Sequence, residues 1–344
     1  MSSFTVGLAI IGGLLLALLV AYNAWSTRRN TPRQPEAGVA AAQPPAHSPP
    51  QSLADRQDPV FDPPPLPALE KKPGLDALID VLTPIALEAP VSGDAALAAL
   101  PPTRRAGSKP FAIEGFNEFT QEWEAAQPGQ RYGAFQAGVQ LANRTGALNE
   151  IEYSEFVVKV QAFADELNGT PDFPDMLDEV ARARELDQFA SAHDAQLGFT
   201  LRAKNSAWSP GYVQQHASRL GFVAGAIPGR MVLPATTPGA PPLLGLSFDT
   251  QAALADDPAQ SALRELTLSL DVPQVDRAEQ PFLRMRDAAL ALAAAMEGIV
   301  TDDNGDVIRP EGLDVIGADL EQLYDTLEAR DLAAGSPLAR RLFS

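Results

Sequence analysis

The sequence contains no cysteine, which excludes disulfide bonds, thiolate metal sites and cysteine nucleophiles. The absence also suits a reducing cytoplasm. Histidine is scarce, because the chain has only His47, His193 and His216, and these lie far apart in the sequence. His216 has no neighbour that resembles a ligand partner, so it is interpreted as an ordinary histidine of a helix.

Positive charge is in short supply. The chain has 26 Lys and Arg residues against 44 Asp and Glu residues, which gives a formal net charge of -18. A protein this acidic repels the phosphate backbone of nucleic acids. Nucleic acid is therefore not an expected partner.

Motifs of catalysis are also missing. The chain contains no glycine-rich phosphate loop, no H-E-x-x-H and no G-x-S-x-G. Without such groups the sequence predicts a protein that is not an enzyme, with no small-molecule substrate and no cofactor.

One acidic cluster imitates the start of a calcium-binding EF-hand loop. It consists of Asp302, Asn304 and Asp306, but Val307 stands where the loop requires glycine, and Leu313 stands where it requires the bidentate glutamate. Asn304 is followed by glycine, which is the strongest short signal for a hairpin. We therefore predict a plain turn without a metal ion.

The first 27 residues are predicted to be a membrane anchor. The run Phe4–Trp25 is uncharged and strongly apolar, and as a helix it spans roughly 33 Å, enough to cross a bilayer. Arg28, Arg29 and Arg33 follow the run, so the positive-inside rule places the rest of the chain in the cytoplasm and the N-terminus outside. A cleaved signal peptide is the alternative, but no Lys or Arg precedes the run.

Residues 28–73 are predicted to be a disordered linker. This stretch is rich in Pro, Ala and Gln and poor in apolar side chains, which favours an extended polyproline II conformation. Fully extended, such a linker holds a folded domain on the order of 100 Å from the bilayer.

The remaining chain is predicted to be an α+β fold in which one order of elements runs twice. The first module is expected at 74–191, the second at 192–331 and a C-terminal tail at 332–344. Each pass contains a strand, a helix, further strands and two helices, which indicates a tandem duplication of one β/α module. A helix of the second module is expected to open at Ser209, with Pro210 in its first turn. A single larger α+β domain is the alternative.

Two predicted strands of the second module alternate between apolar and polar residues with the period of a half-buried strand. Their core-facing residues are expected to be Leu197, Phe199, Leu201, Leu266, Leu268 and Leu270. The residues between them are expected on the opposite face of the sheet: Gly198, Thr200, Arg202, Thr267, Ser269 and Asp271.

Three stretches resemble the ZipA family of bacterial cell-division proteins. They are Gln214–Gly225 (QQHASRLGFVAG), Leu266–Pro273 (LTLSLDVP) and Ala293–Leu313 (AAAMEGIVTDDNGDVIRPEGL). The order of anchor, Pro-rich spacer and C-terminal β/α domain is similar as well. The first module and the polar character of the open sheet face depart from the family pattern.

The resemblance implies that the C-terminal domain is an antiparallel sheet with helices packed on one face. It also implies an adaptor that tethers filaments of the tubulin-like protein FtsZ to the cytoplasmic face of the inner membrane at the division site. The C-terminal tail of FtsZ would bind on the open sheet face, and the candidate contacts are Thr200, Arg202, Ile227, Phe248, Thr267 and Ser269. The alternative function is an envelope scaffold whose acidic domain is exported.

Overall fold

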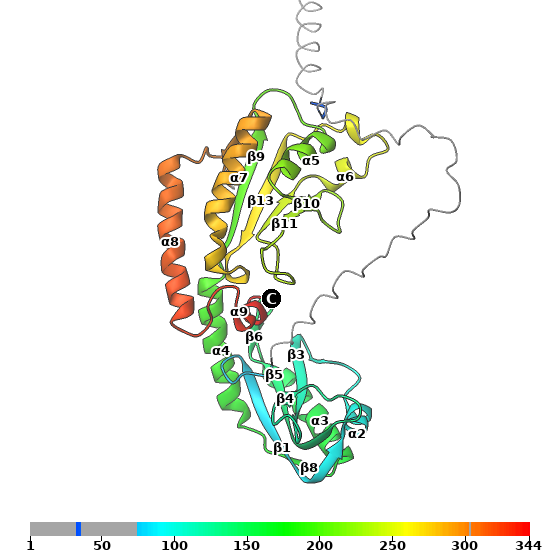
Figure 1. Cartoon of the computed structure of the whole chain (residues 1–344). Coiled ribbons are helices and arrows are strands. Elements are labelled where there is room, and N and C mark those ends of the chain that lie inside the picture. Colours follow the sequence, from blue (N-terminus) through cyan, green and yellow to red (C-terminus); the bar gives the residue numbers. More distant parts are fainter. Residues whose placement is uncertain (1–31, 36–73, 303) are drawn as a thin grey trace, which may run out of the picture. The chain divides into compact units, whose positions relative to one another are not determined.

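The computed structural model describes residues 32–35, 74–302 and 304–344, which form two compact units. We name each unit by its central helix (Figure 1). The α3 unit, with helix α3 (Glu150–Glu166), contains residues 74–196, 271–278 and 318–344. The α7 unit, with helix α7 (Pro281–Met296), contains residues 32–35, 197–270 and 279–317.

The predicted anchor, Phe4–Trp25, lies outside the described residues. In the part of the chain that the structure does describe, no helix has both the length and the apolar composition that crossing a membrane requires.

The α3 unit contains an antiparallel sheet with the strand order β2-β3-β5-β1-β8, and β4 also pairs with β3. A small separate ladder joins β6 to β7. The strands are β1 (Asp80–Ser92), β2 (Arg105–Ala106), β3 (Lys109–Asn117), β4 (Trp123–Glu124), β5 (Arg131–Gln140), β6 (Ala142–Asn143), β7 (Gly146–Ala147) and β8 (Gly169–Pro171).

Helix α3 covers the apolar face of this sheet. Phe156 meets Phe111 of β3 edge to face at 5.7 Å between ring centroids, and Phe163 meets Phe135 of β5 at 5.2 Å. Asn149 caps the helix by accepting hydrogen bonds from two backbone amides of its first turn. The other helices of this unit are α2 (Gly93–Ala99), α4 (Met176–His193) and α9 (Pro337–Leu342).

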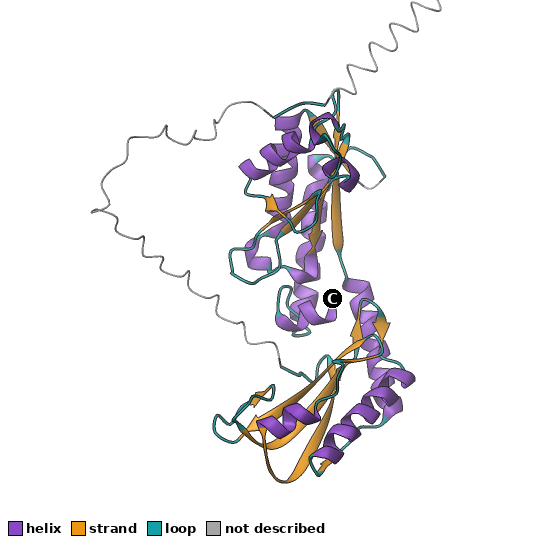
Figure 2. Ribbon diagram, turned by 90° about the vertical axis from the view of Figure 1, so that its right-hand side faces the viewer, coloured by secondary structure: helices purple, strands orange, loops and turns teal. Residues whose placement is uncertain are grey.

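The α7 unit contains a second sheet, with the strand order β10-β11-β12-β13-β9-β14. Its strands are β9 (Gln196–Ala203), β10 (Val223–Ala224), β11 (Arg230–Leu233), β12 (Leu244–Ser247), β13 (Glu265–Asp271) and β14 (Gly298–Thr301). Figure 2 shows these strands together with the helices beside them.

Helix α7 covers the apolar face of the second sheet, where Phe282 packs on Phe199 of β9. Helix α5 (Pro210–Arg219) begins as predicted, with Ser209 as its cap and Pro210 in its first turn. The remaining elements are the short helix α6 (Thr250–Ala253), three 3-10 turns (Pro258–Gln260, Val272–Gln274 and Arg277–Glu279) and α8 (Pro310–Glu328), which contributes residues to both units.

The period-two alternation of the sequence is confirmed. Leu201, Leu266, Leu268 and Leu270 are at most 2% exposed, and Phe199 is 3% exposed. Leu197 is only half-buried, because it stands near the start of β9 where the sheet begins. The apolar set therefore faces the helices, and the polar set faces away from them.

Both sheets share one strand order. With the short elements β4, β6 and β7 set aside, one unit has the order strand, helix, three strands, helix, strand, helix: β1-α2-β2-β3-β5-α3-β8-α4. With β10, α6 and the 3-10 turns set aside, the other unit has the same order: β9-α5-β11-β12-β13-α7-β14-α8. Matched in this way, the sheet orders β2-β3-β5-β1-β8 and β11-β12-β13-β9-β14 correspond strand by strand. This is the split β-α-β arrangement with one additional strand.

Residues 332–344, expected as a tail, contain helix α9 and pack into the α3 unit. Arg341 of α9 forms an ion pair with Asp80 of β1 at 2.5 Å, and it also donates to the carbonyl of Gly74. Asp80 is fully buried, and this burial raises the pKa of its carboxyl, although the bond with Arg341 acts in the opposite direction. The last residues of the chain therefore complete the core of the α3 unit.

Residues 32–35, expected as part of the linker, are held against the α7 unit. The backbone amide of Arg33 donates to Ala207 O at 2.8 Å, and Ser209 N donates to Arg33 O at 3.0 Å. The Arg33 guanidinium lies 2.5 Å from Glu297, and this hydrogen bond raises the pKa of Arg33 and lowers the pKa of Glu297. We call residues 32–35 the strap.

We predict that Arg341→Met destabilises the protein by about 3 kcal/mol, because it leaves the buried Asp80 carboxylate without its cation. Without Arg341 the folded-state pKa of Asp80 rises further above its ordinary value of 3.8. The loss should therefore be complete above that raised pKa and should fade as the pH falls toward 3.8. Urea denaturation at several pH values measures it.

The matched control is Arg131→Met. Arg131 is exposed and lies 3.8 Å from Glu118, so its loss should cost less than about 0.5 kcal/mol. Equal losses for the two variants, or a loss for Arg341→Met that does not change with pH, would contradict the role given to the buried pair.

Candidate peptide-binding surfaces

Four of the predicted contact residues share one face of the α7 unit sheet. Thr200 and Arg202 stand on β9, and Thr267 and Ser269 stand on β13, the neighbouring strand. Thr200 and Thr267 are half-buried, whereas Arg202 and Ser269 are exposed. The structure therefore brings these four residues together on the face opposite α7.

The other two candidates lie elsewhere. Ile227 is 49% exposed in the turn between β10 and β11. Phe248 follows β12 directly and is only 8% exposed, so its ring belongs to the packed interior. Alternation predicts the direction of side chains only within a strand. Both residues lie outside the strands, so alternation does not predict where their side chains point.

The uncovered face of the α7 unit is polar and low in relief. Ser269 pairs with Gly245 of β12, whose missing side chain leaves the space that the Ser269 hydroxyl occupies. Arg202 lies 3.5 Å from Glu265, and Thr301 donates to the backbone carbonyl of Thr200. Such a face offers hydrogen bonds and only shallow apolar contacts.

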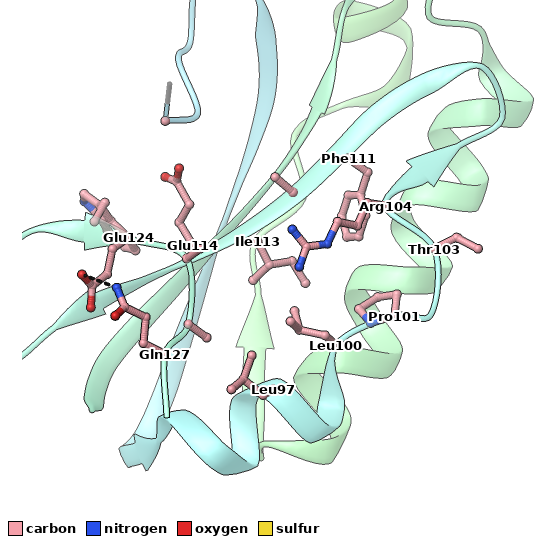
Figure 3. A pocket seen from close by; sticks show the side chains of 15 residues that line it. Leu97, Leu100, Pro101, Thr103, Arg104, Phe111, Ile113, Glu114, Glu124 and Gln127 are labelled. Carbon is pink, nitrogen blue, oxygen red and sulfur yellow. Dashed lines mark hydrogen bonds between the residues drawn. The ribbon is translucent and has the colours of Figure 1, made fainter. Parts of the chain in front are cut away.

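The α3 unit carries a deeper site, a cavity of about 720 Å³ beside β3 (Figure 3). We call it the β3 cavity. Its apolar wall comes from the end of α2, from β3 and from β4: Leu97, Leu100, Pro101, Phe111, Ile113 and Trp123. Polar side chains at the rim include Thr103, Arg104, Glu114, Glu124 and Gln127.

The β3 cavity lies where the edge of the sheet is interrupted. Phe111 N donates to Arg104 O on one side, and Asn117 N donates to Glu122 O on the other. Alternate residues of a strand direct their backbone groups to the same side, so Ile113 N–H and C=O also face this edge. No hydrogen bond within the described residues reaches Ile113 from that side.

The two carboxylates of the rim already have partners. Glu114 accepts hydrogen bonds from Leu75 N at 3.0 Å and from Gln136 Nε2 at 2.9 Å. Glu124 accepts from Asn117 Nδ2 at 2.6 Å and from the hydroxyl of Tyr132 at 3.0 Å. Burial of the Tyr132 hydroxyl raises its pKa, so it remains a donor at neutral pH.

Arg104 differs from these groups. Its side chain is exposed, and Figure 3 shows its guanidinium pointing into the β3 cavity. Within the part of the chain that the structure describes, its guanidinium has no ion pair and no hydrogen bond. The β3 cavity therefore combines an apolar wall, an open stretch of strand edge and one cation that has no ion pair among the described residues.

The acidic turn after β14 is built from hydrogen bonds within the turn. Asp302 Oδ1 accepts from Asn304 N at 2.9 Å and from Asp306 N at 2.8 Å, and Gly305 adopts a φ of +88°. In residues 32–35, 74–302 and 304–344, no group of three or more His, Asp or Glu side chains is arranged to hold a metal ion.

Sequence reasoning missed the β3 cavity. Trp123 is 39% exposed and lines the cavity, with its ring 5.3 Å from that of Phe116. Trp208, by contrast, is fully buried and donates to Met296 O. The local sequence feature that could have pointed to this cavity is an arginine pair close after two prolines, within residues 101–105.

Comparison of the chain with protein-family models and with curated proteins returns no match.

Proposed function

We propose that this protein is an adaptor that tethers FtsZ filaments to the cytoplasmic face of a bacterial inner membrane. The α7 unit binds the C-terminal tail of FtsZ on its uncovered sheet face. One observation carries the proposal: an antiparallel sheet has helices on its apolar face, while Thr200, Arg202, Thr267 and Ser269 stand on the other face.

A short peptide can bind such a face with few deep contacts. Val232 of β11 and Ile299 of β14 are half-buried on this face, and each provides a shallow apolar contact. The hydroxyls of Thr267 and Ser269, which lie between these two apolar contacts, can form hydrogen bonds with the peptide. The expected complex is weak and polar, as is common for short linear motifs in shallow sites.

The tandem duplication of one β/α module forms part of the proposal. Matching element order and matching strand order in the two sheets support it. The α3 unit is then a second copy of the fold whose binding surface has diverged.

The strap changes which parts of the chain the Pro-rich segment separates. Even fully extended, the stretch from Trp25 to Arg33 spans at most roughly 28 Å, at about 3.5 Å per residue. With Arg33 held on the α7 unit, this unit stays near the end of the proposed anchor. Residues 36–73 then lead from the strap to Gly74, so their length adds no distance between the anchor and the α7 unit.

The alternative function is an envelope scaffold with an exported acidic domain. A fluorescent or phosphatase reporter fused after Ser344 separates the two functions, because fluorescence requires a cytoplasmic end and phosphatase activity an exported one. Phosphatase activity would contradict the FtsZ proposal, since FtsZ filaments form in the cytoplasm.

We predict that a labelled FtsZ tail peptide binds the full chain in nanodiscs and that Ser269→Trp weakens this binding by about tenfold. The indole would cover the face above Gly245 without entering the core, since Ser269 is exposed. Fluorescence anisotropy measures the affinity. Ser218→Trp, an exposed site on α5, is the control, and equal affinities for both variants would refute the assigned face.

We also predict that Glu297→Arg moves the α7 unit away from the bilayer, because Arg33 then meets a like charge. Since the chain has no cysteine, Ser218→Cys provides a single labelling site for energy transfer to acceptor lipids. Transfer should fall with Glu297→Arg and recover when Arg33→Glu is added. Glu265→Arg, whose partner is Arg202, is the control; a fall of equal size there would contradict the strap.

A further inference from the structure

We propose that the β3 cavity of the α3 unit binds the free C-terminal end of a polypeptide, with the terminal carboxylate at Arg104 and the last apolar side chain in the cavity. This site lies in a different unit from the proposed FtsZ face, and different observations support it.

The interrupted edge of β3 accepts one short strand. Ile113 N–H and C=O face outward between Arg104, where β2 begins its pairing, and Glu124, where β4 ends its pairing. An added strand would bond to this residue as strands do in β-augmentation. It adds backbone hydrogen bonds that do not depend on the ligand's sequence.

The gap also limits what can bind there. β2 and β4 occupy the same edge of β3 on either side of Ile113, so an added strand cannot continue along β3 in both directions. A segment from the middle of a long strand would collide with one of them. A chain end fits because only its last residues need to lie in the gap, while the rest of the ligand leads away from the sheet edge.

The Arg104 guanidinium identifies which end of the chain binds. Glu114 and Glu124 keep their negative charge, because their hydrogen-bond donors are neutral groups, and their oxygens already accept those bonds. The Arg104 guanidinium has no ion pair and no hydrogen bond among the described residues. A guanidinium binds a carboxylate with two parallel hydrogen bonds, and a C-terminal carboxylate supplies this group.

The apolar wall defines the last side chain of the ligand. Leu97 is 37% exposed at the end of α2 and lines the cavity together with Leu100, so a branched aliphatic group can pack against these two side chains. The ligand class is therefore a polypeptide that ends in Leu, Ile or Val with a free carboxylate.

The test uses the full chain in nanodiscs and a pooled fluorescein-labelled library of hexapeptides that end in Leu, Ile or Val. The library is made as free acids and as C-terminal amides, and anisotropy gives the two apparent affinities. The free acids should bind about tenfold more tightly than the amides, because the bond to Arg104 is charge-assisted.

Arg104→Gln should remove this preference and leave the amide affinity unchanged. Arg105→Gln, at an exposed neighbour outside the cavity lining, should preserve the preference. Leu97→Asp should weaken the binding of both forms. Equal affinity for acids and amides, a preference that persists in Arg104→Gln, or no binding up to about 1 mM would each overturn the proposal.

Discussion

One constraint organises both units: each sheet has a single apolar face, and helices must cover it. The aromatic contacts of Phe156 and Phe163 on one sheet, and of Phe282 on the other, satisfy this constraint. Covering one face leaves the opposite face and the strand edges for other uses. The polar face of the α7 unit and the open edge of β3 are therefore two consequences of the same packing rule.

The same fold thus presents two different surfaces. In the α7 unit, hydroxyl and small side chains on β12 and β13 make a flat face suited to weak, polar contacts. In the α3 unit, the short pairings of β2 and β4 leave a gap beside Ile113 that is bordered by apolar side chains and a cation. The two units therefore differ in strand length and edge chemistry, while helices cover the apolar face of the sheet in both.

Much of the fold follows from local patterns. The helix that starts at Ser209 and Pro210 and the core-facing leucines of β13 are correct because caps and period-two alternation depend on residues close in sequence. Four of six candidate contacts share a face for the same reason. Phe248 is buried and Ile227 lies in a turn, and outside strands no period exists to predict their direction.

By itself, the sequence determined the α+β class and which side chains of β9 and β13 face the helices, since these are set by propensity and periodicity within a few residues. Only the tertiary structure decided the rest. Arg341 meets Asp80 across a separation of 261 residues, and Arg33 forms a parallel bridge with Trp208. Next to an interrupted edge, the Arg104 guanidinium has no ion pair and no hydrogen bond among the described residues. Such features depend on which distant segments meet in space, and no local pattern encodes that choice.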